Sequence, residues 1–155
     1  MVNVAIVGTG RVGQGIAYTL MSEKYVEKLI LIDIASKVSE MVMEELNHAR
    51  AAYGFDLEIE AYTHSRFIEN ADLIVIAAGS PRVPGMTRRD LAEQNAKVIQ
   101  DIMINSLEKN PNAWYFIITN PVDAMATLAY KLAKGNKRII GTGTNLETSR
   151  FRTII

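Results

Sequence analysis

Short apolar runs alternate with longer segments of helical period along the chain, and this alternation restricts the folds that the chain can adopt. A strand buried on both faces is an unbroken apolar run, whereas a helix repeats its apolar residues roughly every three to four positions. Helices that separate such strands predict a parallel sheet with helices on both faces. The expected strands are residues 2–7, 29–32, 57–62, 73–78, 114–119 and 138–140, and the expected helices are residues 11–21, 36–52, 87–107, 122–133 and 146 onward.

One expected strand has a different pattern from the others. Leu57, Ile59 and Ala61 alternate with polar residues, as in a strand with one exposed face. This strand is third in sequence, and the third strand lies at an edge in the order 3-2-1-4-5-6 of dinucleotide-binding folds. We therefore expect an α/β fold of the Rossmann type, with a doubly wound parallel sheet of six strands and helices on both faces. Residues 1–155 form a single domain in this interpretation.

Capping residues mark some of the expected helix ends. Ser36 is the expected N-cap of the second helix, and Gly54 is expected to end that helix. Thr87 and Asp90 have the spacing of a capping box, in which each side chain bonds the backbone N–H of the other residue. This box predicts a helix start immediately after Thr87.

Composition excludes several classes of function. Lys and Arg number 17, as do Asp and Glu, and aromatic residues make up 7% of the chain, so no basic or base-stacking surface for nucleic acid or for an anionic membrane is expected. The chain has no cysteine, and His48 and His64 alone are too few for a zinc site, so no metal is expected. No apolar stretch approaches the ~20 residues that span a bilayer, and the N-terminus does not resemble a signal peptide. These features predict a cytoplasmic protein.

A glycine-rich loop follows the first expected strand and precedes the first expected helix. In such a loop one glycine allows a tight turn, one lets the backbone approach a pyrophosphate, and one lets helix and strand pack closely. Asp33 ends the second expected strand, where a carboxylate can bind the hydroxyls of an adenine ribose and disfavours the 2′-phosphate of NADP. The pattern favours NAD, but a structural turn or a methyltransferase with another adenosine cofactor would also fit it. The loop consists of Gly8, Thr9, Gly10, Arg11, Val12 and Gly13.

Three further segments carry more specific patterns. Residues 77–91 read Ala-Ala-Gly-Ser-Pro-Arg-Val-Pro-Gly-Met-Thr-Arg-Arg-Asp-Leu, residues 119–123 read Thr-Asn-Pro-Val-Asp, and residues 141–152 read Gly-Thr-Gly-Thr-Asn-Leu-Glu-Thr-Ser-Arg-Phe-Arg. Together with the glycine-rich loop, and in the same order, they resemble the lactate/malate dehydrogenase family over essentially the whole chain. The resemblance is strongest to malate dehydrogenases that share the lactate dehydrogenase pattern, archaeal ones included.

The resemblance implies a role for each matching residue. Arg150 matches the arginine that clamps the substrate carboxylate, which suits a planar guanidinium with two parallel donors. Arg88 matches the arginine that closes over the substrate and polarises its carbonyl, and Asn120 the asparagine that contacts both nicotinamide and substrate. The residues expected to line the cofactor beside Asn120 are Asn95, Ile118 and Thr119.

Arg82 occupies the position that determines substrate specificity in the family. Lactate enzymes typically carry Gln there, whereas malate enzymes carry Arg, which pairs with the second carboxylate of the substrate. Burial of that carboxylate without a cation would be costly, so Arg82 favours the dicarboxylates malate and oxaloacetate over lactate and pyruvate. A solvated basic loop is the plainer interpretation of Arg82 and Arg88, and a lactate dehydrogenase is the alternative within the family. The resemblance also implies a homo-oligomer.

Two departures from the family pattern concern its proton carrier, a His held by an Asp. Neither histidine matches that residue, because His48 resembles a structural stretch of a long helix and His64 lies in a polar turn. Glu147 stands where the family usually has the Asp that orients the His, but Thr144 and Glu147 also have the spacing of a capping box.

The last residues of the chain are apolar and carry no helix stop signal. Phe151, Ile154 and Ile155 lie in an expected helix without a following Gly, Asn or Pro. We expect that a second domain with the catalytic His follows in a longer protein, and that the present chain binds NAD without turnover. A complete, non-catalytic nucleotide-binding module is the alternative.

Overall fold

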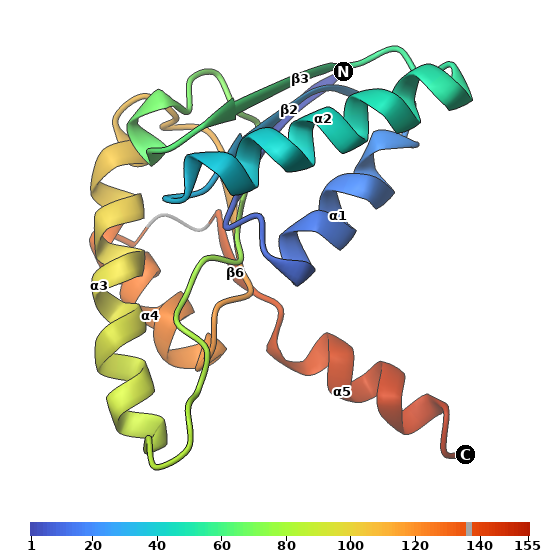
Figure 1. Cartoon of the computed structure of the whole chain (residues 1–155). Coiled ribbons are helices and arrows are strands. Elements are labelled where there is room, and N and C mark those ends of the chain that lie inside the picture. The colour runs from blue at the N-terminus through green and yellow to red at the C-terminus, as the bar shows by residue number, and fades with distance from the viewer. Residues whose placement is uncertain (136–137) are drawn as a thin grey trace.

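The computed structural model describes residues 1–135 and 138–155, which form one parallel sheet flanked by helices. All pairs of neighbouring strands are parallel, in the order β3-β2-β1-β4-β5-β6, which confirms the predicted doubly wound fold with its third strand at an edge (Figure 1). The strands are β1 (Val2–Val7), β2 (Val26–Ile32), β3 (Glu58–Tyr62), β4 (Leu73–Ile76), β5 (Trp114–Ile117) and β6 (Ile139–Gly141). The helices are α1 (Arg11–Met21), α2 (Ser36–Tyr53), the short 3-10 helix η1 (Ser65–Phe67), α3 (Arg88–Leu107), α4 (Val122–Leu132) and α5 (Gly143–Arg152).

The two faces of the sheet are covered by different pairs of helices. In β1, Val4 and Ile6 pack into a cluster with residues of α1 and α2, whereas Ala5 and Val7 pack into a cluster with residues of α3 and α4. Figure 1 shows α1 and α2 on one side of the sheet and α3 and α4 on the other. Because successive strand residues point to opposite faces, an unbroken apolar run is what this arrangement requires.

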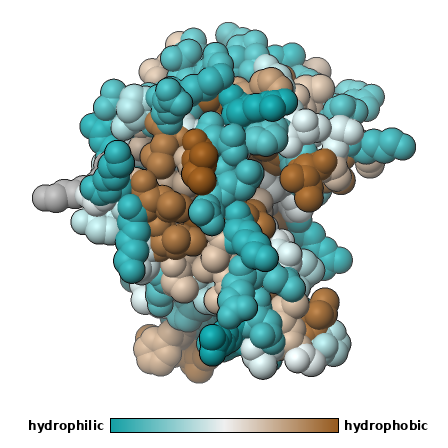
Figure 2. Space-filling view, turned by 90° about the vertical axis from the view of Figure 1, so that its left-hand side faces the viewer, coloured by the Kyte–Doolittle hydropathy of each residue, from teal (hydrophilic) through white to brown (hydrophobic). Residues whose placement is uncertain are grey.

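α3 covers the sheet with one face and meets solvent with the other. Ile99, Ile102 and Met103 are buried against the sheet, while Gln100 and Asp101 are exposed. Figure 2, which views the molecule from the side of α3, shows hydrophilic side chains beside hydrophobic ones on this surface. The helix therefore contributes both core contacts and a polar surface.

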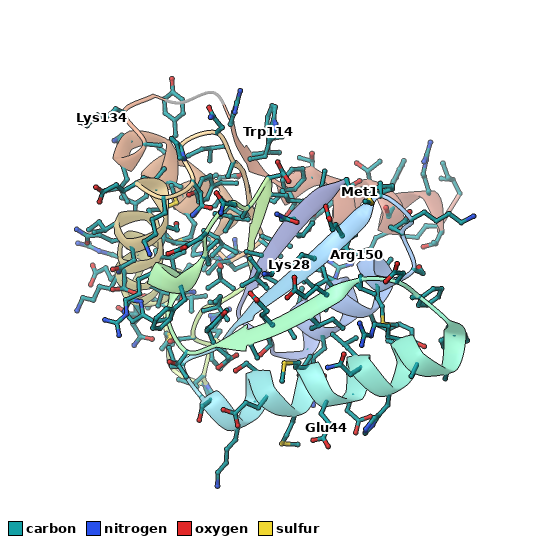
Figure 3. The ribbon with its side chains drawn as sticks, turned by 90° about the horizontal axis from the view of Figure 1, so that it is seen from above. Met1, Lys28, Glu44, Trp114, Lys134 and Arg150 are labelled. Carbon is teal, nitrogen blue, oxygen red and sulfur yellow. The ribbon has the colours of Figure 1, made fainter. Side chains whose placement is uncertain are left out.

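Salt bridges connect the edge strand β3 to β2. Lys28 Nζ lies 2.7 Å from Glu60 Oε1 and 3.3 Å from Glu58 Oε2, and Figure 3 labels Lys28 where β2 and β3 run side by side. The hydrogen bond to Glu60 is the main cause that raises the pKa of Lys28. These polar residues on β2 and β3 explain the alternating pattern of this part of the sequence.

Some predicted helix ends are correct and others are not. The capping box of Thr87 and Asp90 is present, and Gly54 caps α2 in the left-handed conformation with φ 72°. The prediction for Ser36 is wrong, because Ala35 is the N-cap and Ser36 is already helical. The capping box of Thr144 and Glu147 is also wrong, because α5 begins at Gly143, one residue before Thr144.

Candidate functional site

The candidate site lies where the carboxyl ends of four neighbouring strands meet. The glycine-rich loop follows β1, Asp33 follows β2, residues 77–80 follow β4, and residues 118–120 follow β5. The chain leaves β1 toward β2 on one side, and β4 lies on the other side, so the strand order reverses beside β1. A parallel sheet leaves a crevice for ligands at such a point.

The glycine-rich loop fits the backbone of its neighbours so closely that side chains are excluded at two positions. Gly8 has φ +92°, and a Cβ there would lie 2.4 Å from the backbone nitrogen of Ala78. A Cβ on Gly13 would lie 2.0 Å from the carbonyl oxygen of Gly8, so α1 can approach β1 only with glycine there. Gly10 has open space instead, with no described atom within 4 Å of a Cβ beyond its chain neighbours. The loop thus combines tight packing on one side with a free approach to the start of α1.

The carboxylate of Asp33 is held against this loop. Its Oδ2 accepts hydrogen bonds from the backbone N–H of Thr9 at 2.9 Å and from the Thr9 hydroxyl at 3.2 Å, and its Oδ1 accepts from the N–H of Ala35 at 3.1 Å. These contacts fix a negative charge at the edge of a cavity. A ribose hydroxyl could donate to this charge, whereas a phosphate would be repelled by it.

Two cavities flank the glycine-rich loop and share part of their walls. The first, of about 540 Å³, extends from Asp33 between apolar side chains such as Ile34 and Val98. The second, of about 740 Å³, extends over the start of α1 toward α5. Gly8, Gly10 and residues 77, 79 and 80 line both. A glycine loop between two cavities suits a dinucleotide, because the pyrophosphate can lie on the loop with one nucleoside on either side.

The second cavity brings together most of the residues that the sequence singles out. Its walls combine segments far apart in the chain with three guanidinium groups and one carboxylate, so its charge favours an anionic ligand. The predicted residues that line it are Gly8, Gly10, Arg11, Val12, Gly13, Arg82, Arg88, Asn95, Ile118, Thr119, Asn120 and Glu147.

The two arginines of the loop between β4 and α3 are held in different ways. Arg82 Nε donates to the carbonyl oxygen of Met86 at 3.0 Å, within the same loop. Arg88 is the first residue of α3 and directly follows Thr87, whose hydroxyl accepts from the N–H of Asp90 at 3.2 Å. Hydrogen bonds from Thr87 in turn hold the pKa of Asp90 below its ordinary value. The capping box therefore fixes the start of the helix on which Arg88 lies.

Arg150 lies apart from the other predicted residues. It is exposed on α5, is labelled in Figure 3, and is not among the residues that line the two cavities. Its Nη1 lies 3.8 Å from Oε1 of Glu147, one helical turn away. Within the described chain, the side chain of Arg150 thus pairs with Glu147 and lines neither cavity.

Several residues that line the first cavity could not be predicted from the sequence. Ile34 is 95% exposed directly after Asp33, and Val98 and Ile102 face the cavity from α3. An apolar residue beside the acidic one, and a helix face that repeats every four residues, were the available signals, but the same patterns also describe a core. His64 lines this cavity too, and its Nδ1 accepts a hydrogen bond from the N–H of Arg66 at 3.2 Å.

The described residues contain no cluster of three or more His, Cys, Asp or Glu that could hold a metal ion. Among the helices described, none has the length and apolar composition needed to cross a bilayer.

Comparisons with known proteins identify the family of the chain. The family model described as lactate/malate dehydrogenase, NAD binding domain, matches residues 2–141. Over its full length the chain is 41% identical to a malate dehydrogenase from Sulfolobus acidocaldarius and covers 50% of that protein. It is 33% identical to L-lactate dehydrogenase B from Hordeum vulgare, again over its full length and over 45% of that protein.

A solved structure gives the same result. Malate dehydrogenase from Archaeoglobus fulgidus, in complex with NADH, matches with a TM-score of 0.92 and 32% identity, over 97% of this chain and 52% of the other. The chain thus spans about half the length of the curated relatives it matches. The glycine loop between two cavities, the charge of Asp33 and the family match lead to one assignment. This chain belongs to the lactate/malate dehydrogenase family, as its NAD-binding domain.

Proposed function

We propose that the chain is the NAD-binding half of an enzyme that interconverts malate and oxaloacetate. The observation that carries this proposal is that Arg82, Arg88 and Asn120 line one cavity beside the glycine-rich loop. The distinguishing carboxylate of such a dicarboxylate requires a cation, which Arg82 supplies, and its carbonyl requires hydrogen-bond donors, which Arg88 and Asn120 supply.

The proposed roles follow from the chemistry of each side chain. Arg82 pairs with the carboxylate that malate has and lactate lacks. Because its Nε is bonded to Met86, its two terminal nitrogens remain to form a bidentate pair. Arg88 stabilises the negative charge that develops on the carbonyl oxygen, and the Asn120 amide orients that oxygen. The nicotinamide, when bound, supplies a carrier for the two electrons and the hydrogen that leave the substrate carbon.

The remaining groups that the reaction needs are proposed to come from the whole protein. His48 is exposed on α2 and lines neither cavity, and His64 lies on the side of Asp33, in the first cavity. Neither can exchange a proton with a substrate held by Arg82 and Arg88. The acid–base group is therefore proposed to lie outside these 155 residues. Glu147 lines the second cavity and is proposed to orient that group in place of the usual Asp.

Substitution of Arg82 in the whole protein tests the substrate assignment. Arg82→Gln removes a charge-assisted hydrogen bond of roughly 1.5–3 kcal/mol, so kcat/KM for oxaloacetate should fall by about one to two decades. Pyruvate lacks the second carboxylate, so its kcat/KM should hold or rise. Arg88→Gln is the matched control and should lower kcat/KM for both substrates together, because both present the same carbonyl. If Arg82→Gln lowers kcat/KM for oxaloacetate and for pyruvate equally, the assignment to malate is wrong.

A further inference from the structure

The side chain of Asn95 joins two loops of the second cavity. Asn95 lies on α3 and is 1% exposed. Its Oδ1 accepts a hydrogen bond from the backbone N–H of Ser80 at 2.8 Å, and its Nδ2 donates to the carbonyl oxygen of Asn120 at 2.6 Å. Ser80 follows β4 and Asn120 follows β5, so one amide connects the carboxyl ends of two neighbouring strands.

The surroundings of Asn95 reinforce this connection. The hydroxyl of Thr119 donates to the carbonyl oxygen of Ala78 at 2.7 Å, which is a second link between the same two loops. A Cβ on Gly79 would lie 2.7 Å from Cγ2 of Thr119 and 3.1 Å from Oδ1 of Asn95, so glycine is needed for the loops to approach this closely. The loops that follow β4 and β5 therefore pack closely against each other and against the amide of Asn95.

We propose that Asn95 is a positioning residue that fixes the loop of Arg82 relative to Asn120 and so shapes the cavity for the cofactor. The positions of its hydrogen-bond partners explain this role, because Ser80 begins the loop that carries Arg82, and Asn120 follows β5. Two part-buried hydrogen bonds to backbone groups use the amide oxygen and one amide hydrogen, so Asn95 acts on the ligand through Ser80 and Asn120. This inference rests on the proposed function of the second cavity.

Asn95→Asp tests the proposal because the change depends on pH. An ionised carboxylate can still accept from Ser80, but it has no hydrogen to donate and its second oxygen repels the carbonyl of Asn120. A protonated carboxyl restores the donor. Burial would raise the pKa of this carboxyl, and the negative charge of Glu147 would raise it further, whereas Arg11, Arg82 and Arg88 on the same cavity would lower it.

The readout is the affinity for NAD⁺, measured by calorimetry with the 155-residue chain from about pH 5 to about pH 8. For Asn95→Asp we expect affinity about tenfold below wild type at the upper end and recovery toward wild type at the lower end. The wild-type chain, measured at each pH, is the reference for this comparison.

Asn110→Asp is the matched control for a purely structural role. Asn110 is also buried, and its amide donates to the carbonyl oxygens of Ile68 and Ser106 and accepts from the N–H of Ala71. It lies near the opposite end of the sheet, just before β5. Both variants should unfold at lower temperature near pH 8, but only Asn95→Asp should lose affinity for NAD⁺.

Hydrogen exchange of the Ser80 amide separates positioning from direct contact with the cofactor. Because Asn95→Asp keeps an acceptor for the Ser80 N–H, this measurement uses Asn95→Ala, which removes that acceptor. In the cofactor-free chain, Asn95→Ala should speed the exchange by about tenfold, relative to Asn110→Ala. If the Asn95 variants are too unstable, Gly79→Ala is the substitute, because it forces the two loops apart without removing a hydrogen-bonding group. It should weaken NAD⁺ binding and speed exchange of the Ser80 amide at every pH.

Two results would overturn the proposal. One is wild-type affinity of Asn95→Asp for NAD⁺ near pH 8, and the other is exchange of the Ser80 amide in Asn95→Ala that is no faster than in Asn110→Ala. Failure of the wild-type chain to bind NAD⁺ would instead contradict the function of the cavity, and Ser80 exchange would still decide whether Asn95 holds the loops.

Discussion

At the scale of single residues, Asp33 shows how the chain holds a charge where a cofactor needs it. Three hydrogen bonds from Thr9 and Ala35 leave the carboxylate little freedom to turn away from the cavity. The same contacts mean that Asp33 supports the glycine-rich loop as well as facing the ligand. A test of the charge of Asp33 therefore needs a substitution that removes this charge but keeps the hydrogen bonds to the glycine-rich loop.

We expect Asp33 to set the preference for NAD(H) over NADP(H). Asp33→Asn keeps an oxygen that can accept from Thr9 but removes the charge that repels a 2′-phosphate, so the ratio of the two affinities should narrow by about tenfold. Asp33→Ser should narrow it as well and should weaken NADH further, because it also loses the bonds to the loop. Fluorescence titrations with NADH and NADPH measure both ratios. An unchanged ratio in Asp33→Asn would mean that the carboxylate does not face the ribose.

The residues of the candidate site that could be predicted from the sequence are those that belong to a motif, and the others resemble core residues. Arg82, Arg88 and Asn120 could be predicted because a motif fixes them, and they do line one cavity. Ile34 and Val98 could not, since apolar residues at strand ends and on helix faces are common in any core. The reason is physical, because the same apolar side chains line a binding site and fill a hydrophobic core.

At the scale of elements, the capping box of α3 predicts a dependence of stability on pH. The folded protein lowers the pKa of Asp90, so the ionised form stabilises the start of α3. This contribution is fully present above the unfolded pKa of about 3.9 and is lost as pH falls through the lower pKa of the folded state. Asp90→Asn should therefore be less stable than wild type near neutral pH, and the difference should shrink at acidic pH. Urea unfolding across the pH range measures it, and a difference that grows toward acid would contradict the assignment.

The contact of α1 with β1 gives a second prediction for an element. Gly13→Ala would bring a Cβ to 2.0 Å from Gly8 O, so the helix must shift away from the strand. We expect a loss of about 1–3 kcal/mol in stability and much weaker binding of NADH. Gly15→Ala, two residues further along the same helix, meets nothing within 4 Å among the described residues and should gain about 0.5–1 kcal/mol. Unfolding and NADH titrations of both variants measure the contrast, and equal effects would contradict the proposed close contact.

Elements were predictable in kind and order, but their ends were less so. Two apolar runs, 73–78 and 114–119, continue past the paired parts of their strands, which end at Ile76 and Ile117. The residues beyond these ends line the cavities instead, and apolar character does not distinguish a strand residue from a cavity wall. At α5, the spacing of Thr144 and Glu147 predicted Thr144 as the N-cap, but the helix begins at Gly143, so Thr144 is already helical.

At the scale of the whole molecule, the helix α5 differs from the rest of the chain. None of its described residues is buried, and Figure 1 shows it extending away from the sheet. Arg150 and Glu147 lie on this helix and pair with each other. Apart from Glu147, the residues that line the two cavities belong to the sheet and to the loops and helices around it.

We therefore expect the 155-residue chain to bind NADH but not to reduce oxaloacetate. Both cavities and the glycine-rich loop are formed by this chain, so binding needs no further part. Reduction needs an acid–base group beside Arg88, and neither His48 nor His64 lines that cavity. Fluorescence titration measures binding, and loss of NADH absorbance in the presence of oxaloacetate measures turnover. If turnover occurs in the purified chain and disappears in Arg88→Gln, the chain itself is catalytic, and the proposal that its proton carrier lies elsewhere is wrong.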